Sequence, residues 1–193
     1  QEVPIAGADR LKLSEAIIVK DLLALARFCL LPSDDLSLAE TLKSPIFNYD
    51  DDALFDVAVD HDATLWAALQ SRRPETAALL QMMIDLSREQ TPYEFFARVL
   101  DLSDATDPRV IRQRFYARLS LEARDALEAF LDQALAHQSR VAPNLQIFLQ
   151  DFAKIKSPKI LVHGGGKLAS ELTKKMNIEV KMTNGRRITD ADT

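Results

Sequence analysis

The chain has 193 residues, of which 47% are hydrophobic, and its formal net charge is -5. This hydrophobic content is sufficient for a folded core, no apolar run approaches the roughly 20 residues of a membrane-spanning helix, and the single cysteine, Cys29, excludes an internal disulfide. We therefore expect a folded, cytoplasmic protein with no signal peptide and no membrane partner, in which Cys29 is a small core residue.

The beginning of the chain is predicted to be helical. Ser14 is a candidate cap for a helix over 14–31, and Asp34 or Asp35 is expected to cap a short helix over 36–42. The residues available to the buried face of the first helix are Ile17, Leu22, Leu25, Ala26 and Cys29.

Three consecutive aspartates at 50–52 allow two interpretations. Carboxylates in a row can hold a metal ion, but no calcium-loop spacing follows them, and anions are favoured at helix N-termini. We therefore predict a helix start here and no metal site. His61 and His137 have no Cys or Glu at ligand spacing, so each is expected to be a surface or capping histidine.

Four more helices are expected between residues 74 and 140. Each has a start signal, either a capping residue or a proline in the first turn. The signals are Pro74, the capping box Thr91-Pro92-Tyr93-Glu94, Asp107-Pro108 and Ser120. The last of these helices places Leu127, Phe130, Leu131 and Leu135 on one face. No strand pattern competes strongly, so residues 1–140 are predicted to be mainly α with no parallel sheet.

The helix expected after Asp107 carries four arginines, Arg109, Arg112, Arg114 and Arg118. Clustered arginines are typical of contacts with DNA phosphates. A solvated helix face is the alternative, and the charge balance favours it, since residues 1–150 hold 15 Lys+Arg and 24 Asp+Glu, a net of -9. The four arginines are the candidate DNA contacts, and they predict weak, salt-sensitive binding.

Several strings in residues 1–149 form a recognisable series. They are VPIAGADRL at 3–11, VKDLLALAR at 19–27, LPSDDLSLA at 31–39, LKSPIF at 42–47 and APNLQIFL at 142–149. The series resembles AddA-type double-strand-break repair helicase–nucleases of the UvrD-like superfamily 1, within the helical subdomain inserted in the second motor domain.

That resemblance implies ATP- and Mg-dependent DNA unwinding and exonuclease action. The implied partners are DNA, the remaining helicase–nuclease domains and a second nuclease subunit. ATP hydrolysis needs a phosphate-binding loop, a lysine and a carboxylate-held magnesium ion. The sequence has no G-x-x-x-x-G-K-[ST] loop, so no catalytic residue carries over, and we expect a scaffold or regulatory subdomain.

The composition changes near residue 150. The first 150 residues contain 12 Arg, 3 Lys and one glycine, whereas the last 43 contain 2 Arg, 7 Lys and four glycines. The charge of the last 43 is +4, from 9 basic and 5 acidic residues. Two genetic origins explain this shift, and ordinary fluctuation with a glycine-rich loop explains it equally well.

The last segment is predicted to be α/β. A strand over 159–163 precedes the glycines at 164–166, a helix follows over about 167–176, and a second strand over 178–182 leads to a turn at 184–185. A strand, a glycine loop and a helix N-terminus can bind an anion through backbone N–H groups. Three consecutive glycines, taken alone, are also typical of a plain flexible turn, which is the alternative to an anion-binding loop.

Two motifs in this segment, ILVHGGG at 160–166 and NGRRITD at 184–190, together resemble the N-terminal half of acetylglutamate kinase, an amino-acid kinase of arginine biosynthesis. By that resemblance, Gly165 and Gly166 contact the acetylated substrate and the transferred phosphoryl group, and Arg187 clamps a substrate carboxylate. A helix over 145–155 fits this family too, so the junction is expected between about 142 and 156. The family's first strand does not precede 142, and its nucleotide-binding half is expected after Thr193.

The sequence therefore predicts a chimera, with a mainly α helicase subdomain at 1–149 and a partial kinase-like β-α-β tail at 150–193. The leading hypothesis is a fragment of a helicase–exonuclease of recombinational DNA repair, inactive alone. Acetylglutamate kinase activity represented by the tail is one alternative, and a non-enzymatic helical interaction module is another. No cofactor is expected on this chain alone, although both parent families use ATP and Mg, and the oligomeric state stays open.

Overall fold

The computed structural model describes residues 13–59, 64–104, 106–119, 122–138 and 144–154, and the backbone of 182–183 and 186–187. The chain divides into two compact units, Gln1–Leu161 and Val162–Thr193. Within the described residues, no helix has the length and apolar character needed to span a bilayer.

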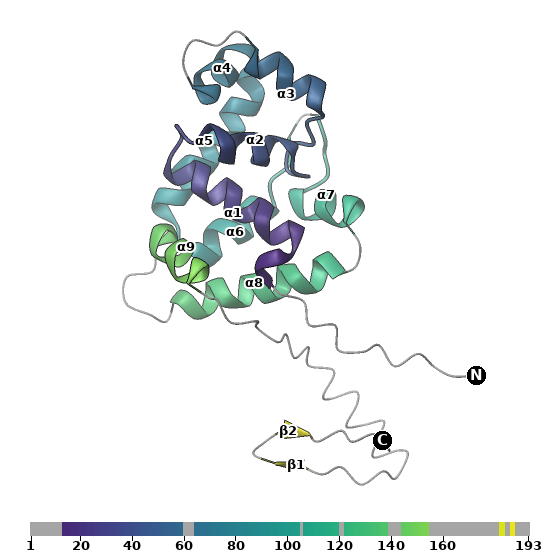
Figure 1. The fold of residues 1–193 in the computed structure, drawn as a ribbon, viewed down its shortest axis with the longest axis vertical. Helices are drawn as coiled ribbons and strands as arrows, with labels where there is room; N and C mark the ends of the chain where they lie inside the picture. Colours follow the sequence, from purple (N-terminus) through teal and green to yellow (C-terminus); the bar gives the residue numbers. More distant parts are fainter. Residues whose placement is uncertain are drawn as a thin grey trace, which may run out of the picture. The chain divides into compact units, whose positions relative to one another are not determined.

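The first unit is a bundle of helices packed around α1 (Figure 1). A 3-10 turn at Leu13–Glu15 leads into α1 (Ile17–Leu30), α2 (Asp35–Lys43), α3 (Asp51–Ala58), α4 (Leu65–Arg72), α5 (Pro74–Glu89), α6 (Pro92–Leu100), α7 (Ile111–Arg118), α8 (Glu122–Gln138) and α9 (Leu145–Ala153). Helix α1 contacts α2, α5, α8 and α9. The described residues of this unit form no strand, so the prediction of a mainly α fold is confirmed for them.

Several of these helices begin at side-chain caps, as predicted. The Asp34 carboxylate accepts a hydrogen bond from the Ser37 N–H at 3.1 Å and caps α2. The Asp50 carboxylate accepts from the Ala53 N–H at 2.8 Å and caps α3. Thr91 forms the expected capping box with the glutamate three residues later. The aspartates at 50–52 therefore mark a helix start, because they satisfy free N–H groups and complement the helix dipole.

Two predicted helix starts are wrong. Ser14 does not cap α1, which begins at Ile17 after an N-cap, Ala16, that has no side-chain hydrogen bond. Helix α7 begins at Ile111, not directly after residues 107–108, because the Asp107 carboxylate accepts from the Arg109 N–H at 3.0 Å and holds a loop there. The predicted cap Ser120 lies outside the described residues.

The core of this unit is aromatic where α6, α8 and α9 meet. The Phe96 ring lies edge-on to Phe130, with 4.8 Å between the ring centroids, and Phe148 lies 5.9 Å from Phe96. Phe130 and Phe152 are 5.5 Å apart. Such edge-to-face pairs add to the free energy gained from burying the rings.

The predicted buried faces are correct in part. Cys29 is buried in the core as expected, and burial raises the pKa of its thiol, which therefore stays protonated at neutral pH. Ile17, however, is 59% exposed because it lines a cleft, and Leu135 is 48% exposed because the buried stripe of α8 is narrower than the predicted face. The pair of methionines in α5 is divided, with Met83 buried and Met82 exposed.

His137 is not a surface or capping residue. Its side chain is 6% exposed and its ring centroid lies 5.5 Å from that of Phe148. The Nδ1 atom lies 3.9 Å from the Asp151 carboxylate, and Nε2 has no hydrogen-bond partner among the described residues. The packing of α9 covers this histidine, which the sequence of α8 does not reveal. His61 lies outside the described residues.

In the second unit, the described residues form a small antiparallel pair. Strand β1 (Met182–Thr183) pairs with β2 (Arg186–Arg187), and Thr183 lies opposite Arg186. This register leaves two residues, 184 and 185, between the paired positions, as the predicted Asn-Gly turn requires. The predicted strand at 159–163, the glycines at 164–166 and the helix at 167–176 lie outside the described residues. The β-α-β arrangement therefore stays a prediction.

Candidate functional site

Arg114, one of the four candidate DNA contacts, is buried inside the helical unit. Its side chain is 6% exposed. The guanidinium donates to the backbone oxygens of Ile46 and Asp107 at 2.8 and 2.7 Å, and to the Asp104 carboxylate at 2.7 Å. The Arg109 carbonyl accepts a further bond, at 3.0 Å. The guanidinium has five N–H donors in one plane and can therefore bond several acceptors at once. The side chain thus joins α7 to two separate loops.

Two aspartates in the loop before α7 are held in the charged state. Burial acts to raise the pKa of Asp104, but hydrogen bonds from Thr106 and Arg114 outweigh it, and the net shift is downward. The pKa of Asp107 is lowered to about 2, chiefly by hydrogen bonds from the Arg109 side chain and backbone. The Arg109 Nη2 atom lies 2.6 Å from the Asp107 carboxylate. The loop therefore forms a compact network of opposite charges.

The other two arginines also have oxygen partners in the protein. The Arg112 guanidinium lies 3.7 Å from the Asp101 carboxylate. Arg118 donates to the Lys43 carbonyl at 2.9 Å and to the Asn48 side-chain oxygen at 3.0 Å. The four arginines thus do not present a set of free cations, and their contact with DNA stays a prediction.

The candidate residues of the kinase-like tail are described only in part. Gly165 and Gly166 lie outside the described residues. Arg187 is placed by its backbone in β2, opposite Met182. The substrate-binding role of these three residues stays a prediction.

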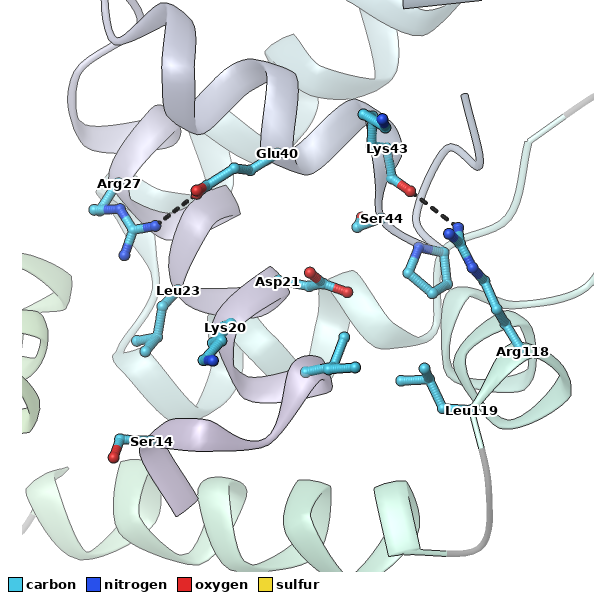
Figure 2. Close-up of a pocket in the computed structure, with 12 residues that line it drawn as sticks. Ser14, Lys20, Asp21, Leu23, Arg27, Glu40, Lys43, Ser44, Arg118 and Leu119 are labelled. Atoms are coloured by element: carbon cyan, nitrogen blue, oxygen red, sulfur yellow. Dashed lines mark hydrogen bonds and ion pairs between the residues drawn. The ribbon is translucent and has the colours of Figure 1, made fainter. Parts of the chain in front are cut away.

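The structure adds a cleft that sequence reasoning missed. It has a volume of about 740 Å³ and lies between the first half of α1, the end of α2 and the end of α7 (Figure 2). The residues that line it are Ser14, Ile17, Lys20, Asp21, Leu23, Arg27, Glu40, Lys43, Ser44, Pro45, Arg118 and Leu119. Cavities of this size are typical of small-ligand sites.

Most of the charged side chains in this cleft are paired within the protein. Arg27 donates to Glu40 at 2.9 Å and to the Ser37 hydroxyl at 3.1 Å. Lys43 is bonded to the Asp51 carboxylate, and Arg118 is bonded to backbone and amide oxygens as described above. The cleft is therefore walled by ionic groups whose hydrogen bonds are directed at neighbouring side chains and backbone.

Asp21 differs from these groups. Figure 2 shows its carboxylate in the middle of the cleft, between the bonded pair of Arg27 and Glu40 and the guanidinium of Arg118. No hydrogen bond joins it to any residue that the structure describes. Burial raises the pKa of Asp21 to about 6, while the charge of Arg118 lowers it and that of Glu40 raises it further. The only sequence signal was the charged pair Lys20-Asp21 in the mostly apolar helix α1.

Comparison with known proteins gives a result for one part of the chain. No family model and no solved structure matches. Acetylglutamate kinase from Cytophaga hutchinsonii is 61% identical over 49 residues, and the enzyme from Parabacteroides distasonis is 57% identical over 49 residues. The enzyme from Bacteroides thetaiotaomicron is 58% identical over 45 residues.

These matches cover 23–25% of this chain and 18–19% of the relatives, so the chain spans about a fifth of the length of the curated relatives it matches. The predicted resemblance to acetylglutamate kinase is thereby confirmed for a segment of the chain, whose length is close to that of the predicted tail at 150–193. None of these findings supports the helicase resemblance of residues 1–149, which stays a prediction.

Proposed function

We propose that residues 150–193 are the substrate-binding beginning of an acetylglutamate kinase, joined to a helical unit of different origin. The identity of 61% over 49 residues carries this proposal. The whole enzyme would transfer a phosphoryl group from ATP to N-acetylglutamate, and this segment would contribute contacts to the substrate but no complete active site.

Three residues carry the proposed substrate contacts. The backbone N–H groups of Gly165 and Gly166 would face the acetylated substrate and the transferred phosphoryl group, where the absence of a side chain permits close approach. Arg187 would bind a substrate carboxylate through two parallel hydrogen bonds. Because successive residues of a strand face opposite sides of it, Arg186 and Arg187 cannot both turn to the same ligand. Arg186 therefore provides a matched control.

A hybrid enzyme tests this proposal directly. Residues 150–193 would replace the corresponding segment of the Cytophaga hutchinsonii kinase, and ATP-dependent phosphorylation of N-acetylglutamate would be measured. We expect the hybrid to be active, with Arg187→Ala raising the KM for N-acetylglutamate at least about tenfold, since a bidentate charged contact contributes more than one neutral hydrogen bond. Arg186→Ala should have a much smaller effect. A folded but inactive hybrid, or equal effects of the two substitutions, would contradict the proposal.

The 193-residue chain itself should not turn over ATP. Phosphoryl transfer requires groups that hold the nucleotide phosphates and magnesium, and the matched relatives are about five times longer than the matched segment. The measurement is ATP consumption with N-acetylglutamate or with single-stranded DNA added. Turnover above background with either addition would contradict the expectation.

A second proposal concerns residues 1–149, as a scaffold or regulatory subdomain of an AddA-type helicase–nuclease. The five sequence strings support it, and so does the capped, all-helical architecture of the described residues. DNA, the remaining motor domains and a second nuclease subunit would be its partners, with ATP and Mg bound elsewhere in the parent enzyme. A non-enzymatic interaction module is the alternative.

DNA binding tests the second proposal. A titration of fluorescent single-stranded DNA at physiological salt should give a dissociation constant weaker than about 1 µM, the tight end of nonspecific binding. Replacing Arg109 and Arg112 by alanine should weaken it further, whereas Arg124→Ala, an exposed arginine on α8, should not. Tight binding at high salt, or binding that does not change with the Arg109 and Arg112 substitutions, would count against the role of these arginines.

The joining of the two segments has its own test. Sequencing the source DNA across codons 140–160 distinguishes a natural gene fusion from a cloning or assembly product. Uninterrupted genomic sequence across the junction supports a genuine fusion. Failure to amplify across it supports two separate genes.

A further inference from the structure

The cleft of Figure 2 contains a partly exposed carboxylate to which the described residues donate no hydrogen bond. Within the part of the chain that the structure describes, the Asp21 carboxylate receives no hydrogen bond, although it is half-buried at the centre of the cleft. Removing a carboxylate from water without giving it a donor is unfavourable. A ligand that supplied N–H donors and a positive charge would offset that cost.

The cations that line the cleft do not supply these donors. Arg27 and Lys43 are bonded to Glu40 and Asp51, and Arg118 directs its guanidinium at two uncharged oxygens. Lys20, the fourth cation of the lining, shares no hydrogen bond with Asp21 in the part of the chain that the structure describes. Arg118 is near enough to lower the pKa of Asp21, but the two side chains share no hydrogen bond. The charges of Arg118 and of Lys20 also oppose an incoming cation, so we expect the binding to be weak.

The rest of the lining suits an aliphatic group. Ile17, Leu23, Pro45 and Leu119 lie around Asp21. Ile17 is 59% exposed, so a ligand stem packed on it would remove apolar surface from water. Glu40 lines the same cleft and adds negative charge on the side away from Arg118.

We propose that this cleft binds a primary ammonium or guanidinium group carried on a short aliphatic stem, with Asp21 as the acceptor and Ile17 and Leu119 against the stem. The source of such a group is a free alkyl amine or the side chain of a lysine or arginine in a partner protein. The proposal is independent of the kinase-like tail, because every lining residue belongs to the helical unit.

The test is a titration of the full chain, isotope-labelled for NMR, with n-butylammonium. n-Butanol provides the same stem without charge, and n-butyrate provides the opposite charge. At pH 7.5 we expect saturable shifts of the amides of 17–23 and Leu119, with a dissociation constant of about 1 mM, as for weak small ligands. No saturable shift, or equal shifts with n-butyrate or n-butanol, would overturn the proposal.

Two variants separate the Asp21 contact from general charge effects. Asp21→Asn should weaken n-butylammonium binding at least about tenfold, the loss expected for a charged hydrogen bond. Asp52→Asn, which neutralises an exposed aspartate outside the cleft, should leave binding unchanged. Equal binding by wild type and Asp21→Asn would overturn the proposal.

Acidification of the wild-type chain provides the same comparison if Asp21→Asn does not fold. Because the pKa of Asp21 is about 6, the carboxylate is mostly protonated at pH 5. Binding of n-butylammonium should then be about tenfold weaker than at pH 7.5, and unchanged binding would overturn the proposal.

A blocked lysine, N-acetyl-lysine amide, identifies the source of the ammonium group. If the blocked lysine binds more tightly than n-butylammonium, the natural ligand is a protein side chain. If it binds more weakly, the natural ligand is a free amine.

Discussion

The guanidinium of Arg114 donates a hydrogen bond to the backbone carbonyl of Ile46, 2.8 Å away and 68 residues earlier in the chain. The same side chain forms an ion pair with Asp104 at 2.7 Å. A residue that sequence reasoning assigned to DNA contact therefore ties the turn after α2 to the start of α7. This arrangement leads to a prediction about stability.

Arg114→Ala should lower the free energy of unfolding by about 3–5 kcal/mol, because Asp104 loses its ion-pair partner and the Ile46 carbonyl loses its side-chain donor. Arg112→Ala provides the control. Its ion pair with Asp101 spans 3.7 Å and is partly exposed, so its loss should cost less than about 1 kcal/mol. Urea unfolding followed by circular dichroism measures both. Similar losses for the two variants would contradict the structural role of Arg114.

Asp21→Asn should stabilise the chain at neutral pH. The pKa of Asp21 is about 6 in the folded protein against an ordinary value of 3.8, so between these pH values the folded state binds more protons than the unfolded state. The free energy of unfolding contributed by this group therefore falls as pH rises from about 4 to 6. After allowance for solvent screening at a partly exposed group, the gain at pH 7 should be about 1 kcal/mol.

The measurement for Asp21 is the difference in unfolding free energy between wild type and Asp21→Asn at pH 4 and pH 7. The difference should be near zero at pH 4, where the carboxyl group of the wild type is largely protonated in the folded state. It should appear by pH 7. A variant that is less stable than wild type at pH 7 would show that the Asp21 carboxylate has a stabilising partner.

The side-chain caps of the helices were predictable from the sequence, because each capping side chain and the backbone N–H group that it bonds are three residues apart. The caps at Asp34, Asp50 and Thr91 are of this kind. Helix α4 was missed, since the apolar residues at 65–69 run consecutively and show no helical period. The burial of His137 and the opening around Asp21 depend on helices far apart in sequence. No local pattern encodes those contacts.

The capping box at Thr91 gives a further test. Thr91→Ala should lower the free energy of unfolding by about 1 kcal/mol, because the α6 N-terminus loses its side-chain acceptor. The Thr91 hydroxyl also receives a hydrogen bond from Gln138 at the end of α8, so the loss should reach beyond α6. Thr91→Ser keeps the hydroxyl and should lose much less. Equal losses for alanine and serine would assign the effect to the threonine methyl group.

The aromatic cluster gives an expected loss of the same size as that for Arg114→Ala. Phe130 is fully buried and lies 4.8, 5.7 and 5.5 Å, between ring centroids, from Phe96, Phe148 and Phe152. Phe130→Ala should therefore cost about 3–5 kcal/mol, from lost burial and the cavity left behind. Phe55→Ala, at a side chain that is 63% exposed, should cost less than about 1 kcal/mol. Thermal unfolding of both variants measures the contrast.

The helical unit should fold without residues 162–193. Every buried apolar side chain among the described residues lies between Leu13 and Phe152, so no described part of its core comes from the second unit. A chain that ends at residue 161 should therefore keep the helical circular dichroism of residues 13–154, and its Tm should lie within about 2 °C of the full chain, which corresponds to less than 1 kcal/mol for a protein of this size. Core packing among the described residues of the first unit then accounts for its stability, and residues 162–193 contribute none of it. A loss of more than about 5 °C would mean that the two segments stabilise each other, and the proposal of two independent origins would be wrong.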